Sequence, residues 1–148
     1  MIIFVSVNLK RLFKDQKNYC WPRPDTCPQC GIDGLWGHGF VLAYFDDLPA
    51  GVFLRRYRCH NCGCVLRLRP NGFFRRFQAS IETIRSSLSR RLSGGRYLSG
   101  ISKSRQRHWL KGLLRNVTAY LGDQWNRRLL DGFDHLKACG FIPVTCAV

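Results

Sequence analysis

CPQCG at residues 27–31 and CHNCG at residues 59–63 are the two motifs around which this chain is expected to fold. Each motif separates two cysteines by two residues and follows them with a glycine. This spacing lets both thiolates of a tight turn face one ion, and glycine accepts the positive φ that the turn requires. Four thiolates complete a tetrahedral site without an open position, so the motifs predict one structural Zn²⁺ ion. The predicted ligands are Cys27, Cys30, Cys59 and Cys62.

Eight cysteines among 148 residues also allow a disulfide framework or a redox-active dithiol. The chain is apolar from Met1 and becomes basic only at Lys10, which reverses the order of a secretory signal. We therefore expect a cytoplasmic, nucleoid-associated protein with reduced thiols. The CxxCG repeat favours Cys62 over Cys64 as the fourth ligand, and the completed site leaves no position for His38. The remaining cysteines are interpreted as free thiols: Cys20, Cys139 and Cys146.

The residues between and after the two motifs predict a small antiparallel sheet. Residues 35–45 and 52–58 are rich in aromatic and β-branched side chains and flank a turn of Asp, Pro and Gly residues. Residues 64–69 alternate in polarity and predict a third strand. We expect residues 25–70 to form a three-stranded zinc ribbon, on which residues 1–24 pack through their apolar start. So small a sheet buries little apolar surface, so metal binding should supply much of its folding free energy.

After residue 70 the apolar residues recur with the period of an α-helix. Helices are predicted at residues 80–93, 104–121 and 123–138, and Gly112 is expected to weaken the second by about 1 kcal/mol relative to Ala. The predicted apolar stripe of the second helix comprises Leu110, Leu113, Leu114, Val117 and Leu121. The fold class is therefore α+β: a zinc ribbon followed by a basic, helix-turn-helix-like three-helix bundle at residues 71–148.

The chain carries a net charge of +15, from 24 Lys and Arg residues against nine Asp and Glu residues. Residues 75–115 hold eleven of these basic residues and a single acid, Glu82. Charge this dense and this localised predicts contacts with phosphate groups. A solvated basic surface and attraction to anionic lipid are the alternative interpretations.

The second predicted helix, with Ser102 or Ser104 as its N-cap, carries most of the candidate nucleic-acid contacts. In a helix-turn-helix motif the first residues of this helix enter the major groove, where Arg suits guanine and Gln suits adenine. Arg105, Gln106 and Arg107 are therefore expected to face base edges. The remaining predicted nucleic-acid contacts are Lys103, Lys111, Arg115, Arg75 and Arg76.

The order of motifs resembles the N-terminal regions of bacterial insertion-sequence transposases and the small zinc-ribbon proteins that accompany such elements. The resemblance covers about residues 25–121 and rests on CPxCG, Trp-Gly-His-Gly, Arg-Tyr-Arg-Cys-x-x-Cys-Gly, Leu-Arg-Pro and Ser-Lys-Ser-Arg-x-Arg-x-Trp-Leu. It implies metal ligation by the four paired cysteines and DNA contact by the basic start of the second helix. Transposases of this kind cut DNA with a carboxylate trio that holds two metal ions. The nine acids of this chain form no such pattern, so no enzymatic activity is expected.

The leading hypothesis is a non-catalytic, zinc-stabilised protein that binds duplex DNA of a mobile element or an operator, with a transposase subunit as a further partner. The sequence has no apolar run of about 18 residues for a membrane span, and nothing in it indicates a small-molecule substrate. One alternative is an RNA-binding or ribosome-associated ribbon in which Trp36, Phe40, Tyr57 and residues 73–77 stack on unpaired bases. Core packing is the simpler interpretation of these aromatic residues. Another alternative is a protein-interaction adaptor.

Overall fold

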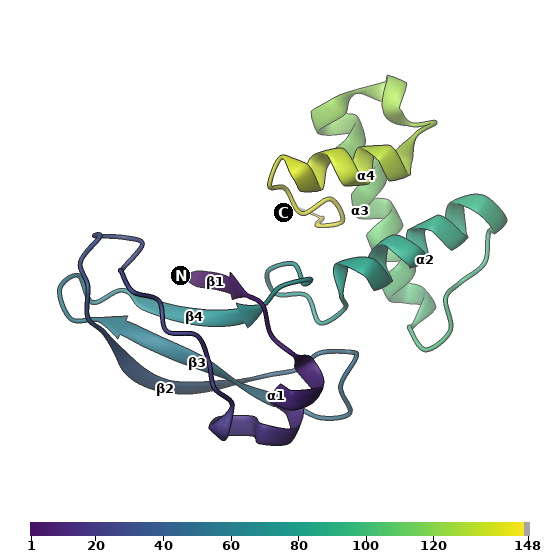
Figure 1. Cartoon of the computed structure of the whole chain (residues 1–148). Coiled ribbons are helices and arrows are strands. Elements are labelled where there is room, and N and C mark those ends of the chain that lie inside the picture. Colours follow the sequence, from purple (N-terminus) through teal and green to yellow (C-terminus); the bar gives the residue numbers. More distant parts are fainter. Residues whose placement is uncertain (147–148) are drawn as a thin grey trace. The chain divides into compact units, whose positions relative to one another are not determined.

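The computed structural model describes residues 1–146 and confirms the α+β class. The chain divides into two compact units, Met1–Ser80 and Ile81–Val148 (Figure 1). Residues 71–80, expected with the helices, belong to the first unit. A β-bridge joins Phe73 to Ser80, and the backbone N–H of Asp46 donates to the carbonyl of Gln78 at 3.0 Å, which ties this segment to the loop between two strands.

The first unit is built on a four-stranded mixed sheet in the order β1-β4-β3-β2. Its strands are β1 (Ile2–Val5), β2 (Leu35–Ala43), β3 (Val52–Cys59) and β4 (Val65–Pro70). The predicted hairpin is β2 and β3, and β4 continues it antiparallel to β3. The expected three-stranded ribbon is too small by one strand, because the apolar start of the chain pairs in parallel with the free edge of β4. The Met1 ammonium anchors this pairing by donating to the Val65 carbonyl at 2.7 Å.

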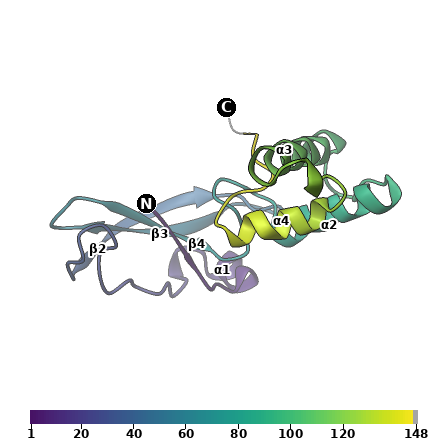
Figure 2. The ribbon, with the colours of Figure 1, turned by 90° about the horizontal axis from the view of Figure 1, so that it is seen from above.

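One face of the sheet is covered by the short helix α1 (Leu9–Asp15), the 3₁₀ turn η1 (Gln16–Asn18) and the segment that leads to β2 (Figures 1 and 2). No helix is predicted here from the sequence, because seven residues are too few to show a helical period. The Asn8 side chain starts α1 by accepting a hydrogen bond from the Arg11 N–H at 3.0 Å. Leu12, the buried residue of α1, then packs into the core.

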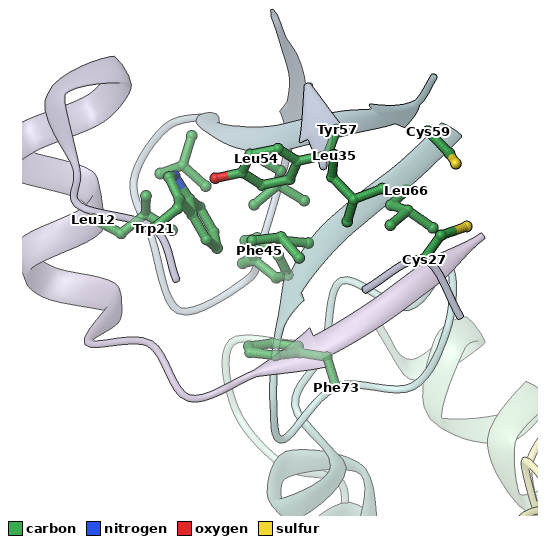
Figure 3. Close-up of a cluster of buried hydrophobic side chains, with 12 residues drawn as sticks. Leu12, Trp21, Cys27, Leu35, Phe45, Leu54, Tyr57, Cys59, Leu66 and Phe73 are labelled. Carbon is green, nitrogen blue, oxygen red and sulfur yellow. The ribbon is translucent and has the colours of Figure 1, made fainter. Parts of the chain in front are cut away.

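A single apolar core joins these parts of the first unit (Figure 3). The side chains of Leu12 and Trp21 lie near those of Leu54 and Tyr57 at one end of the cluster. The sulfur atoms of Cys27 and Cys59 lie at the other end of it. The core of the sheet and the cysteine motifs are therefore continuous, so disruption of one affects the other.

The second unit consists of α2 (Ile81–Gly94), α3 (Lys103–Leu121), the 3₁₀ turn η2 (Asp123–Trp125) and α4 (Leu129–Ala138). The single helix predicted at residues 123–138 is wrong in its first turn. There the N–H of Trp125 donates to the Gly122 carbonyl at 3.2 Å, and the N–H of Arg128 donates to the Trp125 carbonyl at 2.8 Å. These i to i−3 bonds occupy the carbonyls that an α-helix would use, so the α-helix begins only at Leu129.

The helical core largely follows the predicted apolar periodicity, with one correction on α3. Leu113 and Val117 are fully buried as expected, whereas Leu114 is 41% exposed. Trp109 is buried in its place. The reason is geometric, because Trp109 lies four residues before Leu113 on the same face, whereas Leu114 is turned about 100° from Leu113.

Gly112 is a close-packing position and not the weak point that helix propensity predicts. A Cβ atom at Gly112 would lie 2.3 Å from the carbonyl oxygen of Val144. The adjacent turn of α3 holds the same segment, because the Asn116 amide donates to the carbonyls of Pro143 and Thr145, both at 2.8 Å.

No helix among residues 1–146 has the length and apolar character needed to cross a membrane.

Candidate metal centre and basic surface

The four predicted ligands form one cluster of thiols. The Sγ atoms of Cys27, Cys30, Cys59 and Cys62 all lie within 4.8 Å of one another. Two of the Sγ–Sγ distances are 3.7 Å, from Cys27 to Cys62, and 3.6 Å, from Cys30 to Cys59. A tetrahedral ion with bonds of about 2.3 Å to sulfur requires about 3.8 Å between ligand atoms. The cluster therefore has the dimensions of a four-coordinate metal site, and all four cysteines are free of disulfides.

The turns that bring the thiols together are those expected from the glycines. Gly31 and Gly63, which follow the two motifs, have φ values of +73° and +71°. The N–H of Gly31 donates to the Cys27 carbonyl at 2.7 Å, and that of Gly63 donates to the Cys59 carbonyl at 3.1 Å. Each turn therefore closes on its own first cysteine, which directs both thiols of the motif to the same side.

Backbone N–H groups adjust the acidity of these thiols. The N–H of Ile32, with help from the side chain of Asn61, lowers the pKa of Cys30 to about 6. The N–H of Cys64 acts in the same direction on Cys62, but burial and the neighbouring thiols outweigh it and raise the pKa of Cys62 to about 12. A metal binds the thiolate form, so donors that stabilise a thiolate favour ligation.

The other candidate ligands lie outside the cluster. His38 is not among the residues that could share this ion, and Cys64 packs half-buried against the core. His60, inside the second motif, donates from Nδ1 to the Gly34 carbonyl at 2.9 Å. Its ring stacks on Trp36, with 6.0 Å between the ring centroids. The three cysteines interpreted as free thiols form no disulfide.

Four of the predicted nucleic-acid contacts recur every four residues along α3 and form a basic ridge on its exposed side. Lys103, Arg107, Lys111 and Arg115 are all exposed. Ser102 is the N-cap of this helix, since its hydroxyl accepts a hydrogen bond from the Arg105 N–H at 3.3 Å. The Arg105 side chain is half-buried and lies over the Trp109 ring, 5.2 Å from its centroid. Arg75 and Arg76 are also exposed, but they belong to the first unit.

The predicted base contact of Gln106 is wrong. The side chain has no exposed surface, and Ser87 Oγ and the Leu98 N–H donate to its Oε1 at 2.7 and 2.8 Å. Its Nε2 donates to the carbonyls of Leu98 and Ile101 at 2.8 and 3.0 Å. All four hydrogen-bonding positions of the amide are used, so none remains for a base. The helical period contained this signal, because Gln106 lies three residues before the buried Trp109.

The structure also separates the aromatic residues of the RNA hypothesis. Tyr57, Phe73 and Phe74 are 6%, 4% and 7% exposed, so they are core residues. Phe40 is half-buried and makes an edge contact with Phe53. Trp36, by contrast, is 66% exposed. Of the single aromatic residues named for stacking, Trp36 presents the most open ring.

Tyr97 lies in the connection between α2 and α3, and its sequence context predicts no role for it. Its ring lies beside the cations of Arg91, Lys103 and Arg107. The only local signal is an aromatic residue within a stretch rich in Gly and Ser, and such a residue has no helical period.

Comparison with models of protein families, with curated proteins and with solved structures finds no match.

Proposed function

We propose that the protein is a non-catalytic, zinc-stabilised DNA-binding protein that places the exposed side of α3 against a duplex. The observation that carries this proposal is the ridge of Lys103, Arg107, Lys111 and Arg115. Within residues 1–146, none of these four cations forms an ion pair with a carboxylate. Like charges four residues apart destabilise a helix, and phosphate groups would offset that cost.

The ridge has dimensions suited to a DNA groove. From Lys103 to Arg115 the helix rises about 18 Å, and an α-helix enters a major groove of about 12 Å width. In this arrangement Arg105 and Arg107 provide the base contacts, while Lys103, Lys111 and Arg115 contact phosphates. Because Arg107 Nε donates to the Tyr97 hydroxyl at 2.8 Å, only its terminal amino groups are available to a base.

Zinc is the metal that this thiol set favours. Four thiolates in tetrahedral geometry are typical of Zn²⁺ or of an iron–sulfur site, and the paired CxxC spacing is that of structural zinc. When bound, the ion would crosslink the loop before β2 to the turn between β3 and β4, and it would leave no open position for chemistry. The ligands would be Cys27, Cys30, Cys59 and Cys62.

Titration of duplex DNA against salt tests the proposal. Three phosphate contacts, from Lys103, Lys111 and Arg115, predict a plot of log affinity against log salt with a slope of about −3 or steeper. Lys111→Ala should weaken binding to every duplex alike and make the slope shallower by about one, whereas Arg105→Ala should reduce sequence preference. Absence of duplex binding at low salt, or equal effects of the two variants on sequence preference, would contradict the placement of α3.

A second candidate function is binding of unpaired bases, favoured by the exposed ring of Trp36. Trp36, Arg58, His60 and Asn61 line a groove of about 460 Å³ beside the cysteine cluster. An aromatic ring next to a cation is the usual platform for single-stranded nucleic acid. Competition between single-stranded RNA and duplex DNA distinguishes the two functions. If the protein binds unpaired bases, Trp36→Ala should reduce its affinity for single-stranded RNA. Lys111→Ala should not weaken single-strand binding more than duplex binding.

The resemblance to transposase regions adds the cellular setting to the proposal. We infer that the duplex is an element end or an operator, that a transposase subunit is a protein partner, and that the protein is nucleoid-associated. Retention of a protein partner after nuclease treatment, together with absence of DNA binding, would instead favour the adaptor hypothesis.

A further inference from the structure

Tyr97 is the centre of a cluster of three cations in the helical unit. The guanidinium carbon of Arg91 lies 4.3 Å from the centroid of its ring. The Lys103 Nζ lies 5.7 Å from the same centroid, and the Arg107 guanidinium carbon lies 5.6 Å from it. One cation comes from the last turn of α2 and two come from the first turns of α3, so the connection between these helices gathers charge from both.

The cluster has no counter-charge in the part of the chain that the structure describes. Arg91 Nη1 donates to the Gly95 carbonyl at 2.6 Å, and Arg107 Nε donates to the Tyr97 hydroxyl at 2.8 Å. Across residues 1–146, neither arginine forms an ion pair with a carboxylate, nor does Lys103. Contacts to the half-buried Tyr97 ring compensate only part of the repulsion between three like charges. A bound anion would offset the remainder.

Buried hydrogen bonds hold the segment that carries Tyr97 in place. The buried amide of Gln106 bonds to the N–H and the carbonyl of Leu98 and to the carbonyl of Ile101. Gln106 also accepts from Ser87 of α2, so the connection is fixed to both helices that supply the cations. The Ser102 cap opens α3 beside the cluster, and the start of a helix carries partial positive charge.

We propose that Arg91, Lys103, Arg107 and Tyr97 form a clamp for a single phosphate group. The three cations supply the charge, and one terminal amino group of Arg107 contacts the phosphate while the other is left for the base contact. The Tyr97 hydroxyl accepts from Arg107 Nε, and its O–H proton remains to donate to a phosphate oxygen. That the phosphate belongs to a nucleic-acid backbone rests on the proposed function. The clamp itself requires only the phosphate, which free pyrophosphate also supplies.

Two measurements on the full chain separate the clamp from the proposed function. In the first, NMR follows the Arg107 Nε–H and Tyr97 ring signals during titration with sodium pyrophosphate, at constant ionic strength. Both signals should shift saturably in the wild type. Neither signal should shift in Arg91→Ala. The Arg107 signal, which Tyr97→Leu retains, should not shift in that variant. This arm tests the clamp without any nucleic acid.

In the second measurement, fluorescence anisotropy reports duplex DNA affinity across a salt series. Arg91→Ala should lower affinity about tenfold at 0.1 M salt and make the salt slope shallower by about one, because one phosphate contact is lost. Tyr97→Phe should lower affinity about twofold to threefold with an unchanged slope, because it removes the hydroxyl but no charge. The matched control is Arg127→Ala, an exposed arginine of the same unit, which should change affinity less than twofold.

The outcomes identify which statement fails. If the wild type binds duplex DNA but Arg91→Ala and Tyr97→Phe match Arg127→Ala, and pyrophosphate shifts no Tyr97 signal, the clamp is overturned and the proposed function stands. If pyrophosphate shifts both signals but no duplex binds, the clamp stands and the proposed function fails. Arg91→Lys keeps the charge and should retain most of the affinity, so a loss as large as that of Arg91→Ala from a folded protein would count against the clamp.

Discussion

At the scale of single residues, Gln106 shows how one buried amide organises an exposed surface. It has no exposed surface itself, yet it fixes the connection from which Tyr97 projects. Of its two neighbours, Arg107 is exposed and Arg105 is half-buried. A buried polar group is tolerated only when its hydrogen bonds are made, so the rigidity of this connection depends on the whole amide.

Removal of this amide should destabilise the helical unit. Gln106→Ala leaves the Leu98 N–H and the Ser87 hydroxyl without their buried acceptor, which should cost about 2–4 kcal/mol in the free energy of unfolding. Urea unfolding followed by far-ultraviolet circular dichroism measures this. The control is Gln124→Ala, an exposed glutamine whose amide donates to the nearby Leu121 carbonyl. Equal unfolding midpoints for the two variants would refute the bonding role of Gln106.

Gly112 offers a second test, because helix propensity and packing predict opposite effects of a Gly112→Ala substitution on stability. Ala is the better helix former by about 1 kcal/mol, but its Cβ would lie 2.3 Å from a backbone oxygen of Val144. We expect Gly112→Ala to lower stability by about 1–3 kcal/mol in thermal unfolding, because the clash exceeds the propensity gain. Gly94→Ala, at a helical site with nothing within 4 Å, should be neutral or stabilising. A stabilising Gly112→Ala would show that the segment after α4 does not pack on α3.

At the scale of elements, α3 combines two faces with different tasks. Its inward face packs Trp109, Leu113 and Val117 into the core of the helical unit, while its outward face carries the basic ridge. The helices α2 and α4 are joined by an ion pair, in which Arg85 Nη2 and Asp134 Oδ2 are 2.7 Å apart. The hydrogen bond from Arg85 holds the pKa of Asp134 below its ordinary value.

This ion pair should make the stability of the helical unit depend on pH in the acid range. Because the pKa of Asp134 is lower in the folded protein, the stabilisation is present above the ordinary Asp pKa of about 3.9 and is lost as pH falls through the lowered value. Both side chains are more than 40% exposed, so Asp134→Asn should cost only about 0.5–1 kcal/mol at pH 7. Chemical unfolding of wild type and variant at several pH values should show this difference disappearing in acid. A difference that persists at pH 2 would indicate a cause other than ionisation.

At the scale of the whole molecule, the two units depend on different forces. The sheet unit joins its core to the cysteine cluster through Cys27 and Cys59, whereas the helical unit closes on apolar side chains and on polar bonds such as those of Gln106. Both units are basic: twelve Lys and Arg residues face five acids in residues 1–80, and twelve face four acids in residues 81–148. Polyanion binding therefore has charge available in each unit.

Metal removal should affect one unit far more than the other. Chelation of the full chain should abolish the tertiary near-ultraviolet signal and the dispersed NMR resonances of residues 1–80, because the ion supplies much of their folding free energy. The helices beyond Ile81 should persist. Purified protein should contain about one zinc ion per chain, and Cys62→Ser should reduce this, whereas Cys139→Ser, at an exposed free thiol, should not. An unchanged spectrum after complete metal removal would contradict the structural role.

The features that depend on short spacings could be predicted from the order of the residues alone. These are the paired cysteine turns, the hairpin between them, the helical periods after residue 80 and the concentration of positive charge. They could be predicted because neighbours within a few residues decide turn geometry and periodicity.

The way in which distant segments combine is visible only in the folded chain. Folding paired β1 with β4 across more than sixty residues of chain, turned Gln106 inward, seated Val144 against Gly112 and gathered three cations around Tyr97. The physical reason is that burial depends on which surfaces meet in space. The sequence around a polar residue, a glycine or an isolated tyrosine has no periodic pattern from which its contacts could be predicted.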